Sequence, residues 1–150
     1  MRVLKGTEGG RAMNHGMTTV FYVDDNARSR SVLSTVLADC GFKMITAADP
    51  VEALCRCRET CFDLALLDYE MLSLTGSQLA REIKHLTPNV PIVLLSGYAA
   101  LPETELVFVD AHFGHGTHLD DLVGTMRRLT NSGPPTRVIQ VSTTAWSDST

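Results

Sequence analysis

The sequence has no apolar run close to the roughly 20 residues that a membrane-spanning helix needs. Its first 17 residues are polar and rich in glycine, so they also lack the apolar segment of a secretory signal. No internal repeat is visible. We therefore expect a soluble, cytoplasmic protein that makes no contact with membranes.

Positive charge is scarce as well. The chain has 13 Lys and Arg against 17 Asp and Glu, which gives a net charge of -4. A protein that mainly neutralises phosphate backbones carries the opposite excess, so direct DNA binding is not expected. Nor is there a glycine-rich phosphate loop after the first apolar run, where Asp24 and Asp25 stand instead. This argues against a nucleotide or flavin binder.

The sequence has four cysteines, but their spacing does not clearly indicate a set of disulfides or a metal site. Three of the four cysteines, Cys55, Cys57 and Cys61, fall within a helical pattern, and no His or Cys pair at zinc spacing follows them. We expect reduced thiols. A metal or redox site that uses Cys57 and Cys61 on one helix face is the alternative.

The length and composition indicate one folded domain with two tails. A chain of 150 residues with 44% hydrophobic residues can bury one substantial core. Residues 1–17 are predicted to be a flexible N-terminal tail and residues 18–130 the domain. Residues 131–150, which contain Ser, Thr and Pro and one short apolar stretch at 138–141, are predicted to be a second flexible tail.

Short apolar runs alternate with helical patterns along the domain. The runs at 20–23, 64–67 and 92–95 predict strands that are buried on both faces, and weaker strands are expected at 44–47 and 111–113. Asn26 and Asp49 are predicted helix N-caps, and apolar residues recur at helical spacing in 79–86 and 119–129. This alternation predicts an α/β fold with a parallel sheet covered by helices on both faces.

Polar residues end the three strong strands: Asp24 and Asp25, then Asp68, then Ser96. Carboxyl ends of parallel strands meet at one edge of the sheet, where ligands of such folds bind. Three carboxylates at one edge repel each other, so a compensating cation is needed. Mg²⁺ is the cation whose oxygen preference fits best.

Three motifs in this order and spacing carry a resemblance to a known family: Phe-Tyr-Val-Asp-Asp-Asn, Leu-Leu-Asp-Tyr-Glu-Met followed by Gly76, and Ile-Val-Leu-Leu-Ser-Gly. The segment from about residue 20 to 129 resembles the receiver domain of two-component response regulators. The resemblance implies a doubly wound, flavodoxin-like sheet of five parallel strands in the order 2-1-3-4-5.

The resemblance also implies a site. Asp68 would be the phospho-acceptor for a histidine kinase or phosphotransfer protein. Asp25, Asp68 and the backbone carbonyl of Glu70 would bind Mg²⁺, with Asp24 acting directly or through water. Ser96 would contact the phosphoryl group.

Two further positions take a role from the resemblance. Gly97, which has no side chain, would leave the phosphoryl group accessible. Tyr98 would tune its lifetime, and the side chain of Glu70 would act in the same way.

Several positions depart from the family pattern. His115 stands at the position of the family's lysine, and His112 at the position of a switch aromatic. Leu72 replaces a proline, and residues 102–107 leave room for only a stunted helix. The fixed cation of the site is thereby replaced by an imidazole, whose ordinary pKa is about 6.5.

The predicted function is that of an atypical, single-domain response regulator that signals by protein contact to a downstream protein, as a monomer or weak dimer. It would not be an enzyme beyond self-dephosphorylation. One alternative is a pseudo-receiver that binds partners without phosphorylation. Another is a Mg²⁺-dependent phosphohydrolase with Asp68 as nucleophile.

Overall fold

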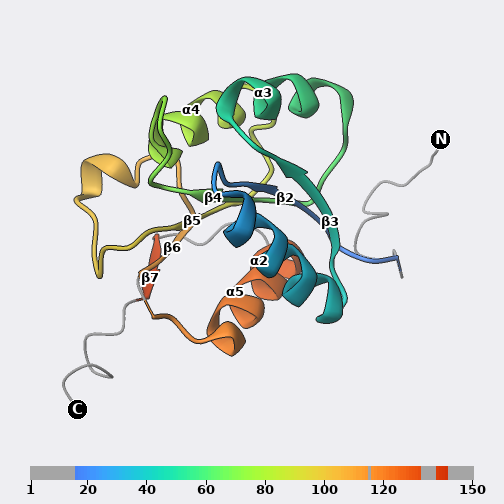
Figure 1. Ribbon diagram of the computed structural model, residues 1–150. Coiled ribbons are helices and arrows are strands. Elements are labelled where there is room, and N and C mark those ends of the chain that lie inside the picture. The colour runs from blue at the N-terminus through green and yellow to red at the C-terminus, as the bar shows by residue number, and fades with distance from the viewer. Residues whose placement is uncertain (1–15, 115, 133–137, 142–150) are drawn as a thin grey trace, which may run out of the picture.

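The computed structural model describes residues 16–114, 116–132 and 138–141. Strands and helices alternate through these residues, as predicted (Figure 1). The elements are β2 (Thr19–Val23), α2 (Ala27–Asp39), β3 (Lys43–Ala47), α3 (Pro50–Glu59), β4 (Leu64–Asp68), α4 (Gly76–Leu86), β5 (Ile92–Leu95), η1 (Glu103–Glu105), β6 (Ala111–Phe113), α5 (Leu119–Ser132) and β7 (Ile139–Val141).

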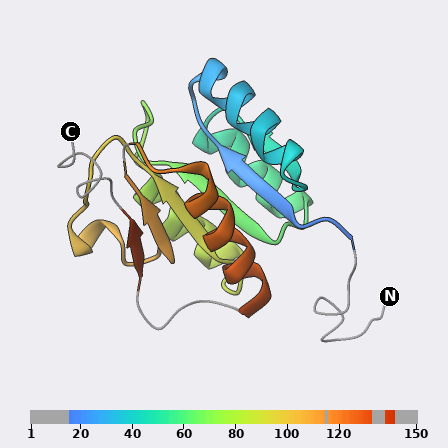
Figure 2. The same ribbon diagram turned by 90° about the horizontal axis from the view of Figure 1, so that it is seen from below.

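The strands form one parallel sheet in the order β3-β2-β4-β5-β6-β7. Its first five strands have the predicted 2-1-3-4-5 order, so the doubly wound fold is confirmed. Helices α3 and α4 cover one face, and α2 and α5 cover the other (Figures 1 and 2). The carboxyl ends of β2, β4 and β5 therefore meet at one edge.

Each central strand is buried on both sides, which explains its unbroken apolar run. Along β2, Phe21 and Val23 belong to the core beneath α3 and α4. Val20 and Tyr22 alternate with them and belong to the core beneath α2 and α5. Two separate cores thus hold the sheet in place from opposite faces.

The predicted helix starts are confirmed by their side-chain caps. Oδ1 of Asn26 accepts the backbone N–H of Ser29 at 2.9 Å, and Oδ1 of Asp49 accepts that of Glu52 at 2.8 Å. These oxygens satisfy N–H groups that a first helical turn leaves unpaired. The first of these helices begins directly after Asp24 and Asp25, so its cap helps to fix the turn that carries them.

The predicted C-terminal tail, residues 131–150, is wrong in part. Helix α5 continues to Ser132, and Ile139–Val141 form a sixth strand that pairs in parallel with β6. Ile139 and Val141 pack against the core shared with α5, which offsets the cost of ordering so short a strand. The rest of both predicted tails, 1–15, 133–137 and 142–150, lies outside the described residues.

The segment between β5 and β6 is reduced, as predicted. Only one 3₁₀ turn, Glu103–Glu105, stands where 102–107 left room for a short helix. All four cysteines lie among the described residues as free thiols. In the part of the chain that the structure describes, no helix has the length and apolar character to cross a membrane.

Candidate functional site

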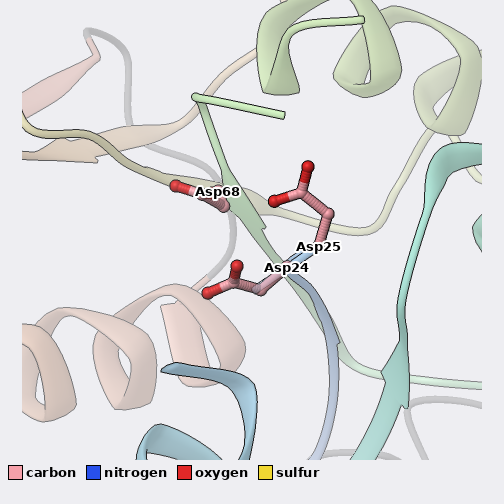
Figure 3. Close-up of side chains that lie close together, drawn as sticks. All are labelled: Asp24, Asp25 and Asp68. Carbon is pink, nitrogen blue, oxygen red and sulfur yellow. The ribbon is translucent and has the colours of Figure 1, made fainter. Parts of the chain in front are cut away.

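Three carboxylates gather at the carboxyl edge of the sheet. Asp24 and Asp25 directly follow β2, and Asp68 ends the neighbouring strand β4 (Figure 3). One oxygen from each of the three lies within 4.8 Å of the others. The parallel register, which pairs Val23 with Leu67, brings Asp24 level with Asp68. The sequence-predicted acidic site therefore exists as a spatial cluster.

Asp24 is held in a fixed orientation inside the protein. Its side chain is only 5% exposed. Oδ2 accepts the hydroxyl of Tyr22 at 2.6 Å, and Oδ1 accepts the backbone N–H of Asn26 at 2.9 Å. The guanidinium of Arg30 donates to the backbone carbonyl of Asp24 at 2.8 Å. Each carboxylate oxygen keeps a lone pair free, which is enough to bind a cation directly or through water.

Asp25 and Asp68 are partly open to solvent. Oδ2 of Asp25 accepts the backbone N–H of Leu72 at 2.9 Å, which ties the turn after β2 to the loop after β4. The pKa of Asp68 is raised to about 7, first by burial and then by the negative charges of Asp24, Glu70 and Asp25. The carboxylates thus create a local excess of negative charge.

This donor set fits a hard divalent cation. Asp24, Asp25 and Asp68 offer only oxygen, and their mutual repulsion is relieved by positive charge. Mg²⁺ suits one or two carboxylates together with retained waters, so the open sides of Asp25 and Asp68 are compatible with it.

Gly76 explains why the loop after β4 can fold over Asp68. A Cβ at this position would lie 2.5 Å from the backbone oxygen of Asp68 and 2.6 Å from Cδ1 of Leu94. The backbone N–H of Gly76 also donates to the carbonyl of Tyr69 at 2.9 Å. Only a residue without a side chain permits this close packing behind the acidic cluster.

Glu70 connects two loops of the site. Both of its carboxylate oxygens accept the backbone N–H of Gly97, each at 3.1 Å. The next residue, Tyr98, is 56% exposed and packs its ring edge-on against Tyr69, with the centroids 6.2 Å apart. The structure thus brings three predicted tuning residues, Glu70, Gly97 and Tyr98, to the rim of the acidic cluster.

Ser96 lies at the end of β5 and contacts His112 of β6. The distance from Ser96 Oγ to Nε2 of His112 is 2.7 Å, and the other ring nitrogen, Nδ1, lies 2.8 Å from Oε1 of Gln140 on β7. His112 is fully buried, and burial lowers the pKa of its ring. Sequence reasoning missed Gln140, because it placed residues 131–150 in a tail; the apolar stretch at 138–141 was the available signal.

His115, which was predicted to occupy the position of the family's lysine, lies outside the described residues. A cavity of about 390 Å³ opens beside Ser96, between α2 and the start of α5. Its described lining is mostly apolar and contains no lysine or arginine; the lining residues include Leu33, Leu95, Phe113, Thr117 and Leu122.

Comparison with known proteins identifies the family. Residues 20–115 match the family described as the response regulator receiver domain, which is more than half of the chain. The chain therefore belongs to the receiver domains of response regulators in two-component systems. Mg²⁺ and an aspartyl phosphate are general features of this family.

Curated relatives are much longer than this chain. The transcriptional regulatory protein ZraR of Escherichia coli strain K12 is 30% identical over 89 residues, which cover 59% of this chain and 20% of ZraR. The cyclic di-GMP phosphodiesterase response regulator RpfG of Xanthomonas campestris pv. campestris is 33% identical over 81 residues, 51% of this chain and 21% of RpfG. The chain thus spans about a fifth of the length of these relatives.

Solved structures show the same fold. TrrA of Thermotoga maritima, in complex with Mg²⁺-BeF, has a TM-score of 0.70 and 27% identity, covering 75% of this chain and 99% of TrrA. TrrA has also been solved in complex with the histidine kinase ThkA. The chemotaxis protein CheY4 of Vibrio cholerae has a TM-score of 0.69 and 27% identity over 75% of this chain and 98% of its own.

Proposed function

We propose that this receiver accepts a phosphoryl group on Asp68 from a histidine kinase or phosphotransfer protein and signals by protein contact. The observation that supports this most strongly is the convergence of Asp68 with Asp24 and Asp25 at one edge of the sheet. The complex of TrrA with a histidine kinase supports the same class of partner.

In the proposed reaction, a carboxylate oxygen of Asp68 attacks the phosphorus of a phosphohistidine. The P–N bond to the donor histidine breaks as the P–O bond to Asp68 forms, and the electron pair leaves with the imidazole. Bound at Asp24, Asp25, Asp68 and the carbonyl of Glu70, Mg²⁺ would neutralise charge on the transferring group.

The remaining residues of the site position and shield the group. Ser96, at the end of the adjacent strand, is proposed to donate its hydroxyl hydrogen to a phosphoryl oxygen. Gly97 leaves space for that oxygen because it has no side chain. Glu70 holds Gly97 through two 3.1 Å hydrogen bonds, so the two loops that flank Asp68 would move together.

A pseudo-receiver is the second candidate. It is favoured by one observation: the sequence has a histidine, His115, at the predicted position of the lysine that binds the phosphoryl group in this family. In that case the protein would bind its partner without phosphorylation.

The test is incubation with acetyl phosphate and Mg²⁺, followed by intact mass measurement with and without EDTA. We expect a gain of about 80 Da, one phosphoryl group, that requires the metal. Asp68→Asn should abolish this gain. Asp121→Asn makes the same chemical change at an exposed position on α5 and should leave it intact.

Two outcomes separate the candidates. A mass gain that persists in Asp68→Asn would remove Asp68 as the acceptor. No gain in the wild-type protein, together with no detectable Mg²⁺ binding, would favour the pseudo-receiver. Transfer from a phosphorylated histidine kinase in place of acetyl phosphate would then test the proposed donor directly.

A further inference from the structure

The hydrogen bonds around His112 form a chain from β7 to the proposed phosphoryl site. Oε1 of Gln140 faces Nδ1 of His112 at 2.8 Å, and Nε2 of His112 faces Oγ of Ser96 at 2.7 Å. Both distances fall in the range of normal hydrogen bonds. The imidazole ring in the middle of these contacts is fully buried, whereas Ser96 is half-buried and Gln140 is exposed.

The orientation of the Gln140 amide is fixed by a second contact. The backbone N–H of Leu101 donates to the same oxygen, Oε1, at 2.9 Å. A flipped amide would present its NH₂ group to the Leu101 N–H, and two donors would face each other. The carbonyl oxygen therefore faces His112, and Nδ1 must carry a hydrogen in order to donate to it.

The tautomer of His112 then determines the direction in which the hydroxyl of Ser96 donates its hydrogen. A neutral imidazole with hydrogen on Nδ1 has only a lone pair on Nε2, so that nitrogen accepts. Burial favours the neutral ring, since it lowers the pKa of His112. Nε2 of His112, at 2.7 Å, is therefore a nearer acceptor for the single hydroxyl hydrogen of Ser96 than the backbone carbonyl oxygen of Tyr98, at 3.1 Å. The same hydroxyl oxygen accepts the backbone N–H of Tyr98 at 3.1 Å.

We infer that Gln140 and His112 are positioning residues that keep the hydroxyl of Ser96 from donating to a phosphoryl group on Asp68. This inference rests on the proposed function and deepens it. Ser96 can bind a phosphoryl oxygen in two ways: its O–H rotates away and leaves Nε2 of His112 unpaired, or Nε2 gains a hydrogen and donates to Ser96 Oγ. The C-terminal strand β7, through Gln140, thereby sets how strongly the site holds a phosphoryl group.

The first test measures the tautomer directly, by ¹⁵N NMR of the histidine rings at about pH 8, where ordinary imidazoles are neutral. The chain has five histidines, so the loss of one signal in His112→Asn assigns the ring of interest. We expect hydrogen on Nδ1 in the wild-type protein. Gln140→Leu, which lacks the acceptor, should lose this preference, and Gln140→Glu, which keeps an acceptor oxygen, should retain it.

The second test measures the affinity for beryllofluoride with Mg²⁺, a mimic of the phosphoryl group, by isothermal titration calorimetry. Releasing the hydroxyl of Ser96 should let Gln140→Leu bind about five-fold more tightly, the equivalent of one neutral hydrogen bond of about 1 kcal/mol. In a Ser96→Ala background the same substitution should have no effect, because the hydroxyl that it acts on is gone. Ile139→Val, a mild change in the packing of β7, should leave both tautomer and affinity unchanged.

The outcomes distinguish this inference from the proposed function. If Gln140→Leu binds beryllofluoride as the wild type does, or changes affinity equally with and without Ser96, Gln140 does not position the hydroxyl. A wild-type ring with hydrogen on Nε2 would overturn the inference whatever the site binds. If the wild type binds no beryllofluoride and gains no phosphoryl mass, the proposed function fails, while the NMR result still decides the hydrogen-bond chain.

Discussion

The hydroxyl of Tyr22 donates a 2.6 Å hydrogen bond to Oδ2 of Asp24, and both side chains are almost completely buried. The two residues stand two positions apart at the end of β2, so they point to the same face of the sheet. Burial, followed by the hydrogen bond to Asp24, raises the pKa of Tyr22 far above its usual value. The proton therefore stays on Tyr22, which is a permanent donor to a carboxylate of the acidic cluster.

We expect Tyr22→Phe to lower the free energy of unfolding by about 2 kcal/mol in the absence of metal, because a buried carboxylate loses a donor. Urea unfolding followed by circular dichroism would measure the loss. Tyr69→Phe is the matched control: it removes a hydroxyl that donates to Glu105 at 3.0 Å in a more open region. If Tyr69→Phe lowers the free energy of unfolding as much as Tyr22→Phe does, the buried hydrogen bond to Asp24 contributes no more to stability than the more open one to Glu105.

Gly76 and Gly124 provide a second matched pair. Gly76→Ala would force a Cβ to within 2.5 Å of the Asp68 backbone oxygen, so we expect the loop to shift and stability to fall by about 3 kcal/mol. Gly124 lies on the exposed side of α5, and a Cβ added there would meet no atom within 4 Å, so Gly124→Ala should stabilise the helix by about 0.5–1 kcal/mol. Thermal unfolding would measure the stability of both variants. A Gly76→Ala variant as stable as the wild type would contradict the close packing around Gly76.

Local features of the chain could be predicted from the sequence because their causes are local. The apolar runs of β2, β4 and β5 match their burial on both faces, and Asn26 and Asp49 cap the helices that follow them. The acidic cluster could also be predicted, since parallel strands bring their carboxyl ends to one edge. The i, i+2 spacing of Tyr22 and Asp24 was a further signal that could have revealed their contact.

Features that depend on contacts between residues far apart in the sequence could not be predicted in this way. Strand β7 is three residues long, and it exists because β6 offers it a partner and the α5 core covers Ile139 and Val141. The apolar stretch at 138–141 is a local signal for a strand, but it does not reveal that the strand pairs with β6. The contact of Gln140 with His112 depends on that strand and was therefore missed with it. The sequence placed His112 only at the position of a switch aromatic, whereas the structure shows a buried ring with both nitrogens in hydrogen-bond contact.

Lys84 and Asp110 form an ion pair that joins α4 to the start of β6. Nζ of Lys84 lies 3.1 Å from Oδ2 of Asp110, and the side chains are only 19% and 13% exposed. The ammonium also donates to the carbonyl of Val90 at 2.9 Å. We expect Lys84→Met to cost about 2 kcal/mol of stability, because it leaves a poorly solvated carboxylate without its cation.

The control for this pair is the Arg56 and Glu52 bridge on α3, whose side chains are 45% and 38% exposed. Arg56→Met should change the free energy of unfolding by no more than about 0.5 kcal/mol, because water and salt screen an exposed pair. Both variants would be compared by urea unfolding at low and high salt. Equal losses in the two variants would show that burial does not strengthen the Lys84 pair.

The buried ring of His112 makes stability depend on pH. Burial lowers its pKa below the ordinary value of about 6.5, an effect that the hydrogen bond to Gln140 and the charge of Glu70 oppose in part. The unfolded chain therefore binds a proton at His112 more readily than the folded chain does. Its contribution to stability is complete above about pH 6.5 and is lost as pH falls through the lowered pKa of the folded state.

The measurement needs a background in which Asp68 does not titrate, because the raised pKa of Asp68, about 7, acts in the opposite direction over the same range. We would compare Asp68→Asn with Asp68→Asn/His112→Phe by urea unfolding from about pH 8 to pH 5. The stability of the single variant should fall relative to the double variant below about pH 6.5, since phenylalanine does not take up a proton. If the difference in free energy of unfolding between the two variants does not change with pH, the folded protein does not disfavour a protonated His112. The same conclusion would follow if the single variant became more stable relative to the double variant as pH falls.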